Sequence, residues 1–480
     1  MTETKLIKLL RIVEADELHW LGKWVRSPYY NRNSAVIGLF DLLRTFAPDF
    51  KSNRLKREWV FQRLFPDMAY QDGKLRLIMH RLTEQVEGFL VSQRLKQQPL
   101  VARKLLFDEL GERNQYDLFL KQYKSLTKEI EGSTFRDEVY HQDLWQLQYQ
   151  HFFHPRTTRI AMSGDALSAT MQHLDAAYML TKMRYSAELL SRQHILKEVH
   201  EIELLEPVRE IARTHTPFKD DKAFQMYEDL LALMDAPENE TIFLRLDQNV
   251  RQYLELLRPD FQASLIRYLI NNCIRQYNAG KIEFLERQFD LYKIALEKGL
   301  LLNDGLLPDA TFLNIVVTAT TLGEAEWATQ FVQDYLPVLP ADRQEDASRL
   351  GSAFIDFSLQ KYQEVNRHLR LIQSNAIFYL LRVKSLSLRN HFLQFLEDPG
   401  YYELVIHGSR SFDKFLQRNP AISERRIQAY LHLTAFIRSL ARLISHQEKS
   451  PERIKQLRKE LDKTETIIAR QWLEKVLDNL

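Results

Sequence analysis

Histidine and glutamate residues at helical spacing are the side chains of this 480-residue chain that could perform acid–base or metal chemistry. Glu138 and His141 form one Glu-x-x-His motif, and His151 and His154 lie three residues apart. A third group contains His194, Glu198, His200, Glu201 and Glu203. A carboxylate-bridged di-iron site needs two Glu-x-x-His motifs and two further glutamates, and the zinc motif His-Glu-x-x-His is absent. We therefore expect these side chains to cap or solvate helices, and we predict no metal site and no cofactor.

Sequence signatures of common enzyme classes are also missing. Neither Gly-x-Ser-x-Gly nor a phosphate-binding loop occurs. Only 14 of the 480 residues are glycine, whereas about 7% is typical. Nucleotide-binding folds and tight β-hairpins both consume glycine. The sequence therefore predicts no catalytic residue and a protein that is not an enzyme. The remaining alternative is an enzyme whose active site is assembled across helices without a recognisable motif.

Cysteine content and hydropathy bear on the compartment. Cys273 is the single cysteine, which excludes a disulfide within one chain and a zinc site built from several thiolates. No apolar run approaches the ~20 residues that a membrane-spanning helix needs. The first residues, MTETKLIKLL, lack the apolar core and cleavage site of a secretory signal. We predict a cytoplasmic protein with no membrane contact, in which Cys273 fills a packing position.

Basic residues are concentrated at the N-terminus. Residues 1–104 contain 19 Lys and Arg against 11 Asp and Glu, a net charge of +8 that leaves −6 for residues 105–480. A solvated basic helical face is one interpretation of this module. The alternative is a nucleic-acid-binding regulator, because phosphates attract such a surface.

That alternative is supported by a resemblance of LKREWVFQRLFPDMAYQDGKLRLIMHRL to the recognition-helix region of winged-helix regulators, some of which carry helical repeats. The resemblance implies that a DNA groove would face Lys74, Arg76, His80 and Arg81, and that phosphates would contact Lys56 and Arg57. A winged helix next requires a β-hairpin. The segment that follows here, VSQRLKQQPLVARKLLFDEL, is instead typical of helix, turn and helix. We therefore prefer the solvated face.

The stretch KWVRSPYYNRNSAV, residues 23–36, combines tyrosines, arginines and asparagines around Pro28. Proline disfavours helix in the residue before it, and Asn31 and Asn33 are good N-cap residues for the next helix. We interpret the stretch as a corner between two helices. The alternative is a partner-binding loop that uses Tyr29, Tyr30 and Arg32, since aromatic residues and arginine are enriched at interfaces.

Helical periodicity fills nearly every segment. Val36, Leu39, Phe40 and Leu43, for example, follow the apolar spacing of a surface helix. The best strand candidate is NIVVTATT, residues 314–321, and it lies between helical stretches. We predict an all-α protein with well over half of its residues in helices. Three regions are expected: a basic helical module over 1–104, a long-helix linking region over 105–240, and irregular helix pairs over 241–480.

Helix pairs recur in the C-terminal half with turns near Gly280, Gly323 and Gln360, a period of 37 to 43 residues. Periods of 20–50 residues are typical of solenoids, in which each unit buries its apolar face against the next. A final charged segment follows Ser450-Pro451-Glu452, a helix start. Its apolar stripe comprises Ile454, Leu457, Leu461, Ile468 and Trp472. We expect one helix that caps the last repeat, or alternatively a coiled-coil dimer helix.

These units resemble the tetratricopeptide repeat, an antiparallel helix pair of 34 residues. Large aromatic positions match Phe312 and Tyr362, and the closing proline matches Pro340. Ala328, Ala353 and Cys273 stand where the family has small residues. Val365 and Leu285 are larger residues at positions where the family has a small one. The resemblance implies an irregular α-solenoid with a groove that binds a partner.

The resemblance also implies which residues would line this groove, namely non-core positions on the first helix of each unit. These are Arg267, Asn271, Arg275, Asn314, Thr318, Arg349 and Asp356. Their polar and mixed character favours an extended protein or peptide partner over an apolar ligand. The function predicted from the sequence is therefore that of a scaffold without catalytic activity.

Overall fold

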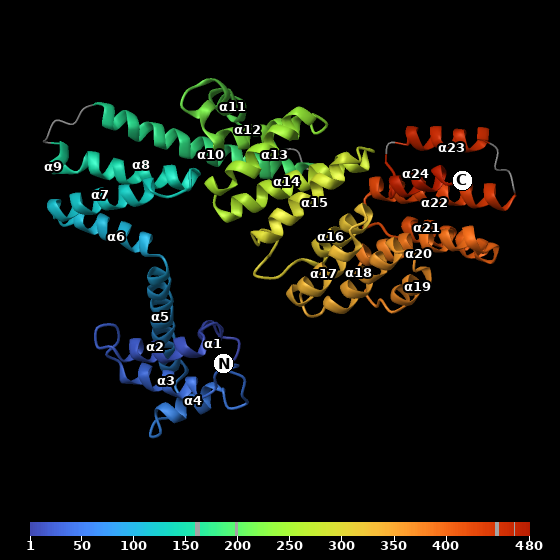
Figure 1. Ribbon diagram of the computed structural model, residues 1–480. Coiled ribbons are helices and arrows are strands. Elements are labelled where there is room, and N and C mark those ends of the chain that lie inside the picture. The colour runs from blue at the N-terminus through green and yellow to red at the C-terminus, as the bar shows by residue number, and fades with distance from the viewer. Residues whose placement is uncertain (159–163, 197–199, 447–450, 465) are drawn as a thin grey trace. The chain divides into compact units, whose positions relative to one another are not determined.

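A computed structural model shows an all-helical protein (Figure 1). It describes residues 1–158, 164–196, 200–446, 451–464 and 466–480. Helices account for 77% of the residues, and the described part of the chain contains 24 α-helices and no β-strand. The all-α prediction is thus confirmed. The strand candidate at residues 314–321 lies within helix α16, Asp309–Leu322, because neighbouring helices bury its β-branched residues.

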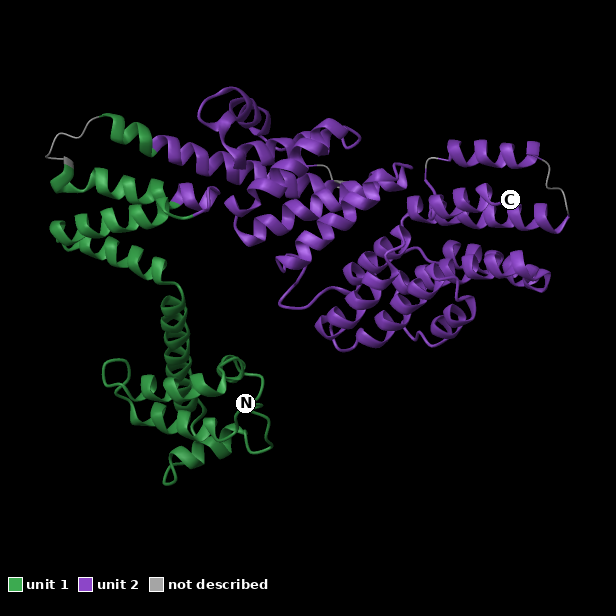
Figure 2. Ribbon diagram, in the orientation of Figure 1, with its two compact units in different colours: residues 1–133, 143–170 green, residues 134–142, 171–480 purple. Residues whose placement is uncertain are grey.

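The chain divides into two compact units, residues 1–133 with 143–170 and residues 134–142 with 171–480 (Figure 2). Helices α8, Glu138–Phe153, and α10, Gly164–Leu196, each contribute to both units. The other helices of the first unit are α1 Lys5–Arg11, α2 Ala15–Arg26, α3 Ser34–Arg44, α4 Arg57–Leu64, α5 Asp72–Gln97, α6 Pro99–Glu112, α7 Tyr116–Glu131 and α9 Pro155–Thr158. Its first four helices pack around α5, and their apolar faces form one core.

The second unit continues as a series of helices in which sequence neighbours pack together. They are α11 Leu205–Thr214, α12 Lys222–Asp235, α13 Glu240–Tyr253, α14 Pro259–Asn278, α15 Glu283–Glu297, α16, α17 Ala325–Tyr335, α18 Gln344–Ser358, α19 Tyr362–Arg370, α20 Ile377–Glu397, α21 Tyr402–Gln417, α22 Glu424–Ser445, α23 Pro451–Lys463 and α24 Arg470–Asp478. Short 3-10 segments occupy Phe218–Asp220, Leu254–Leu256, Leu336–Val338 and Pro399–Tyr401.

Three successive helix pairs, α14–α15, α16–α17 and α18–α19, have turns of the same backbone conformation. Gly280, Gly323 and Gln360 have φ angles of +100°, +89° and +59°. These are the three turn positions that the sequence periodicity predicts as equivalent. Glycine adopts this left-handed conformation without steric cost, whereas a glutamine Cβ is strained there. The third turn therefore retains the geometry without the residue that suits it best.

The helix pairs share one continuous apolar core with the helices that precede them. Ala328, Ala353 and Cys273, at the small positions of the repeat resemblance, are all fully buried. Val365 and Leu285, which depart from that pattern, are buried as well. Small side chains at such positions permit close approach of two helices.

A second core joins α20, α21 and α22 with the last two helices. The apolar stripe of the tail does not lie on one helix: α23 ends at Lys463 and α24 begins at Arg470, after Ala469 with a φ of +57°. The predicted single capping helix is therefore wrong. The break allows both segments to bury apolar residues in the same core, because a continuous helix would carry the second segment away. Ser450 lies outside the described residues.

Candidate functional site

Helix α14 presents the only three predicted groove residues that are plainly exposed within the described structure. Arg267, Asn271 and Arg275 lie one turn apart on one face of the helix. Their side chains make no hydrogen bond or ion pair with any described residue. Arg267 borders a hollow of about 280 Å³ that Arg192 and other side chains of α10 and α12 also line.

The predicted groove residues of α16 are occupied by neighbouring helices. Thr318 is 3% exposed, accepts a hydrogen bond from Gln288 of α15 at 2.9 Å, and donates one to the carbonyl of Asn314 at 2.8 Å. Thr318 is therefore a core residue, which corrects its assignment to an open surface. The Asn314 side chain is half-buried and accepts a hydrogen bond from Arg382 of α20.

On α18 the two predicted residues have partners close in sequence. Arg349 donates to Glu345, one turn earlier, at 2.5 Å. The carboxylate of Asp356 lies 3.4 Å from Nε2 of His368 on α19, and burial raises the pKa of this carboxyl. The seven predicted residues thus differ in exposure and do not form one uniform polar face.

Two arginines that the sequence analysis missed lie on one side of α20. Nη2 of Arg382 donates to Oδ1 of Asn314 at 2.5 Å, and its guanidinium lies 3.7 Å from the ring centre of Phe378. Nε of Arg389 makes a long hydrogen bond of 3.4 Å to the carbonyl of Ser385. Within the described residues, neither guanidinium has a carboxylate within ion-pair distance.

Both arginines are half-buried rather than enclosed. Their remaining N–H groups make no hydrogen bond with described residues, and none of these nitrogens belongs to the fully buried polar atoms that lack a partner. These N–H groups therefore keep contact with solvent. A guanidinium has five N–H donors, so each arginine retains donors for a ligand.

Tyrosines surround the two arginines. Burial lowers the pKa of Arg382 and of Arg389 to about 10, an effect that the nearby Tyr430 of α22 partly offsets at both, and both stay cationic at neutral pH. Burial raises the pKa of Tyr277 on α14 and of Tyr292 on α15 to about 12. We call Arg382, Arg389, Tyr277, Tyr292, Tyr379 and Tyr430 the arginine–tyrosine cluster.

A sequence signal for this cluster exists in α20. Its residues IFYLLRVKSLSLRNHFLQFLE include three basic side chains, and the sole acidic one is the last residue, Glu397. Basic residues in a largely apolar helix with no acidic residue one turn away lack the usual intrahelical partner. The repeat period of the helix pairs did not point to Arg382 and Arg389, because α20 lies outside the three recurring pairs.

Residues 27–33 form the predicted corner between two helices, since α2 ends at Arg26 and α3 begins at Ser34. Asn33 caps α3 by accepting a hydrogen bond from the amide of Ala35 at 3.0 Å, which confirms the N-cap prediction. Tyr30 stacks on Trp24 with ring centres 3.7 Å apart, and Tyr29 is 87% exposed. Nε of Arg32 donates to the carbonyl of Pro28 at 3.2 Å. Tyr29 is thus the residue of this corner that is freest for a partner.

Acidic neighbours engage two of the predicted DNA-contacting arginines. Asp72, at the start of α5, accepts hydrogen bonds from Arg57 at 3.0 Å and from Arg76 at 2.6 Å. Hydrogen bonds from Tyr70 and Arg76 lower the pKa of Asp72 to about 2, so it stays charged at neutral pH. A phosphate would have to compete with this carboxylate for both arginines.

The remaining basic residues of the module are less uniform. Nζ of Lys74 lies 4.0 Å from the ring centre of Phe65, and His80 lies 3.4 Å from Glu84. Lys56 and Arg81 are exposed and have no acidic partner within the described residues. The region after α5 is helix α6, and the described chain has no strand that could form the hairpin of a winged helix.

Glu138 and the Nε2 atom of His141 are buried between helices rather than solvated, which corrects that expectation for this motif. Glu138 is 6% exposed and accepts a hydrogen bond from Arg184 of α10 at 2.8 Å. Nδ1 of His141 lies 2.9 Å from Nδ1 of His173, and burial lowers the pKa of His141 to about 3. When both imidazoles are neutral, the N–H of one ring can donate a hydrogen bond to the bare nitrogen of the other.

The second pair packs against aromatic rings, and Nδ1 of His154 also accepts a hydrogen bond of 3.2 Å from the amide of Arg156 at the start of α9, in line with the predicted capping role. His151 stacks on Tyr123 with ring centres 4.0 Å apart, and His154 is 5% exposed and lies 4.6 Å from the ring centre of Phe119. The side chains of His194 and Glu198 lie outside the described residues, whereas His200, Glu201 and Glu203 are exposed. Among residues that the structure describes, no three His, Cys, Asp or Glu side chains are grouped closely enough to hold a metal ion.

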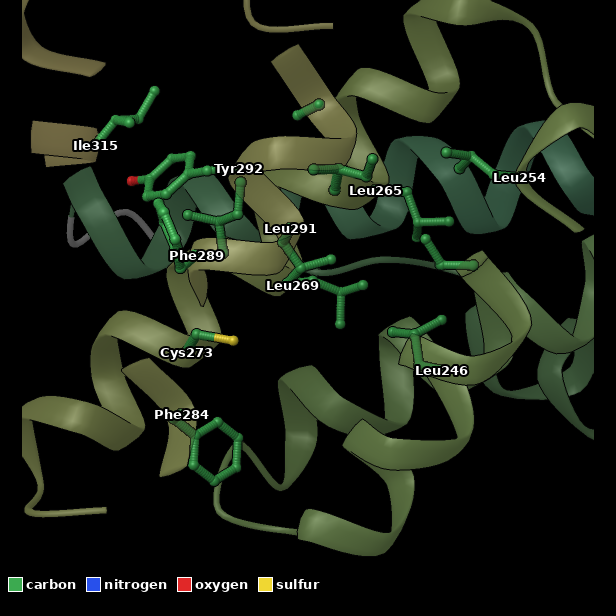
Figure 3. Packing of buried hydrophobic residues seen from close by; sticks show 14 of the residues in the cluster. Leu246, Leu254, Leu265, Leu269, Cys273, Phe284, Phe289, Leu291, Tyr292 and Ile315 are labelled. Atoms are coloured by element: carbon green, nitrogen blue, oxygen red, sulfur yellow. The ribbon is translucent and has the colours of Figure 1, made fainter. Parts of the chain in front are cut away.

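Cys273 is fully buried in the large core of the second unit (Figure 3). Its sulfur lies among apolar side chains that include Leu246, Leu269 and Phe284. Burial, with a smaller contribution from Asp247, raises the pKa of the thiol to about 12. The thiolate is the reactive form of cysteine, so this environment favours packing over reactivity.

Comparison of the chain with family models, with curated proteins and with solved structures gives no match. Among the described helices, none is both long and apolar enough to cross a bilayer.

Proposed function

We propose that this chain is a scaffold without catalytic activity that binds a segment of a partner protein at the arginine–tyrosine cluster. On this proposal, the helix pairs from α14 to α19 form an irregular, tetratricopeptide-like solenoid in the cytoplasm. The three left-handed turns and the shared core support such a repeat. The single observation that carries the proposal is the pair Arg382 and Arg389, half-buried and without a carboxylate partner among the described residues.

Half-buried cations without a carboxylate partner are partly desolvated at a cost in stability, which is why this pair indicates a ligand. Proteins normally pair a buried charge or satisfy its donors, because desolvation of a charge otherwise reduces stability. A protein can tolerate this cost where the charge serves binding. Arginine and tyrosine are also the residue types that dominate the binding energy of many protein interfaces.

The location of the pair also supports a binding role. Arg382 contacts α16 through Asn314, and Arg389 lies 5.3 Å from the ring centre of Phe357 on α18. Tyr277, which lies close enough to Arg389 to influence its pKa, belongs to α14. The cluster therefore adjoins the first helices of all three pairs. In repeat proteins, such helices commonly form the binding surface.

The experiment compares partner capture by the full chain and by two double variants. The test variant carries Arg382→Met and Arg389→Met, which remove both charges at similar side-chain length. The control variant carries Arg410→Met and Arg418→Met, two exposed arginines at α21 without an ion pair to described residues. We expect proteins captured from native lysate, after nuclease treatment, to be lost from the test variant and retained by the control. Retention by both variants would refute the site, provided that circular dichroism shows equal folding.

A further inference from the structure

We propose that the partner segment is extended and acidic, with two carboxylates three residues apart that pair with Arg382 and Arg389. This inference rests on the proposed function and specifies its partner. A carboxylate accepts two parallel N–H groups of one guanidinium, a strong and geometrically specific contact. Both arginines retain such donors toward solvent.

The protein itself does not supply the missing carboxylates from its described residues. Glu474 lies near Tyr277, and Asp309 lies near Tyr379, where each raises the pKa of the tyrosine in addition to the larger effect of burial. Neither carboxylate is within ion-pair distance of Arg382 or Arg389. The acidic residues around the cluster therefore leave its two cations available.

Helix geometry sets the spacing of the partner's charges. Arg382 and Arg389 are seven residues apart on α20, which corresponds to about 10.5 Å at 1.5 Å per residue. An extended segment in the polyproline II conformation advances about 3.1 Å per residue with three residues per turn, so its side chains at positions i and i+3 lie on the same face about 9 Å apart. Adjacent acidic residues would be too close to reach both guanidiniums at once.

The surroundings favour a peptide backbone between the two charges. Tyr430 of α22 lies close enough to both arginines to influence their pKa, and Tyr292 of α15 lies similarly close to Arg382. Phenol groups both donate and accept hydrogen bonds, and an extended segment has unpaired N–H and C=O groups along its length. Aromatic rings of Phe357 and Phe378, which lie against the two guanidiniums, add apolar contact area.

The net charge of residues 105–480 favours an acidic protein segment over a nucleic acid. Residues 105–480 carry a net charge of −6, which repels a polyanion at long range. Two local cations suit two carboxylates, whereas nucleic-acid binding typically neutralises many phosphates.

The test measures binding of synthetic decapeptides to the full chain by isothermal titration calorimetry. The probes contain Gly, Ser and Ala with two Glu residues at i and i+3, at i and i+1, or with both Glu replaced by Gln. We expect the i, i+3 peptide to bind at least tenfold more tightly than either other peptide. Arg382→Met and Arg389→Met should each weaken that binding roughly tenfold, and the Arg410→Met, Arg418→Met control should not change it.

Several results would overturn the inference. They are equal affinity for all three peptides, tighter binding of a thymidine decamer, or unchanged affinity in the two single variants. If a Met variant does not fold, Arg389→Lys replaces it, because lysine keeps the charge but loses the two-point contact; unchanged affinity there would count against the inference too. A captured partner that depends on the cluster but binds through a neutral segment would leave the proposed function intact and refute only the acidic spacing.

Discussion

Arg382 on α20 donates a hydrogen bond of 2.5 Å to Asn314 on α16, across 68 positions of the sequence. The bond joins a helix of the recurring pairs to one that follows them. It also means that part of the surface predicted for a partner is contacted by the chain's own α20.

We predict that removing the acceptor, Asn314, lowers the free energy of unfolding more than removing the donor, Arg382, does. Asn314→Ala should lower the free energy of unfolding by about 1–3 kcal/mol, because it leaves a half-buried donor of Arg382 without its acceptor. Arg382→Met should change it little or raise it, because it removes a partly desolvated charge. Urea denaturation of both single variants and the double variant gives the coupling energy. An Asn314→Ala cost that is equal in both backgrounds would contradict this account.

The left-handed turn at Gln360 should be improvable. Gln360→Gly removes a strained Cβ at φ +59° and should raise the free energy of unfolding by about 1 kcal/mol, which is the difference between the conformational strain and the added chain entropy. Gln360→Ala is the control and should have little effect, since its Cβ is equally strained.

The reverse change at Gly323 should destabilise the protein. Its φ is +89°, and a Cβ added there would meet no atom within 4 Å. The cost of Gly323→Ala, about 1 kcal/mol, should thus come from the backbone alone. Differential scanning calorimetry measures the change in stability for the variants at both turns. A stabilising Gly323→Ala would show that the turn does not require a left-handed residue.

The thiol of Cys273 should be inert in the folded protein and should make stability depend on alkaline pH. Its pKa rises from 9.0 to about 12 on folding, so the folded state holds a proton that the unfolded state loses between these values. Stability from this group is complete below pH 9 and falls as the pH rises toward 12. Denaturation at pH 8 and pH 10 should show a smaller decline for Cys273→Ala than for the natural chain. Rapid labelling of the folded protein by a thiol reagent at pH 8 would contradict the burial.

The exposed arginines of α14 provide a separate test of the groove prediction. The test changes Arg267, Arg275 and Arg349 together to Met. Each of the two changes on α14 should alter the free energy of unfolding by no more than about 0.5 kcal/mol, as exposed substitutions usually do, whereas Arg349 is half-buried and also loses its hydrogen bond to Glu345. We expect the triple variant to weaken capture of a partner whose segment extends along α14. If the partner is retained there and lost on changing Tyr29, Tyr30 and Arg32, the N-terminal corner is the binding site instead.

The nucleic-acid alternative predicts a measurable salt dependence. With Arg57 and Arg76 engaged by Asp72, about two cations of the predicted set, Lys56 and Arg81, remain for phosphates. We therefore expect the full chain to bind duplex DNA weakly, without sequence preference, and with a slope of about −2 in log affinity against log salt concentration. Fluorescence anisotropy measures this slope. Tight, sequence-specific binding at physiological salt, abolished by charge reversal at Lys74, Arg76 and Arg81, would reverse our preference.

Features that depend on neighbouring residues could be predicted from the sequence. Helical content follows from apolar spacing, the cap at Asn33 follows from its side chain, and the turns near Gly280, Gly323 and Gln360 follow from the repeat period. Small residues such as Cys273 could be assigned to packing positions, because their size and spacing within a helix pair already restrict their surroundings.

Burial of individual polar side chains could not be predicted in this way. The sequence neighbours of Thr318 and Arg382 are like those of many exposed residues. The side chains that surround them in the fold come from helices that are distant in sequence. Gln288 donates a hydrogen bond to the buried Thr318, and Asn314 accepts one from Arg382. Local sequence by itself determined that this protein is helical and that its chain turns near Gly280, Gly323 and Gln360, since those properties arise within a few residues. Only the tertiary structure decided which cations lie half-buried without a carboxylate, because the cost and the partners of a charge depend on the helices packed around it.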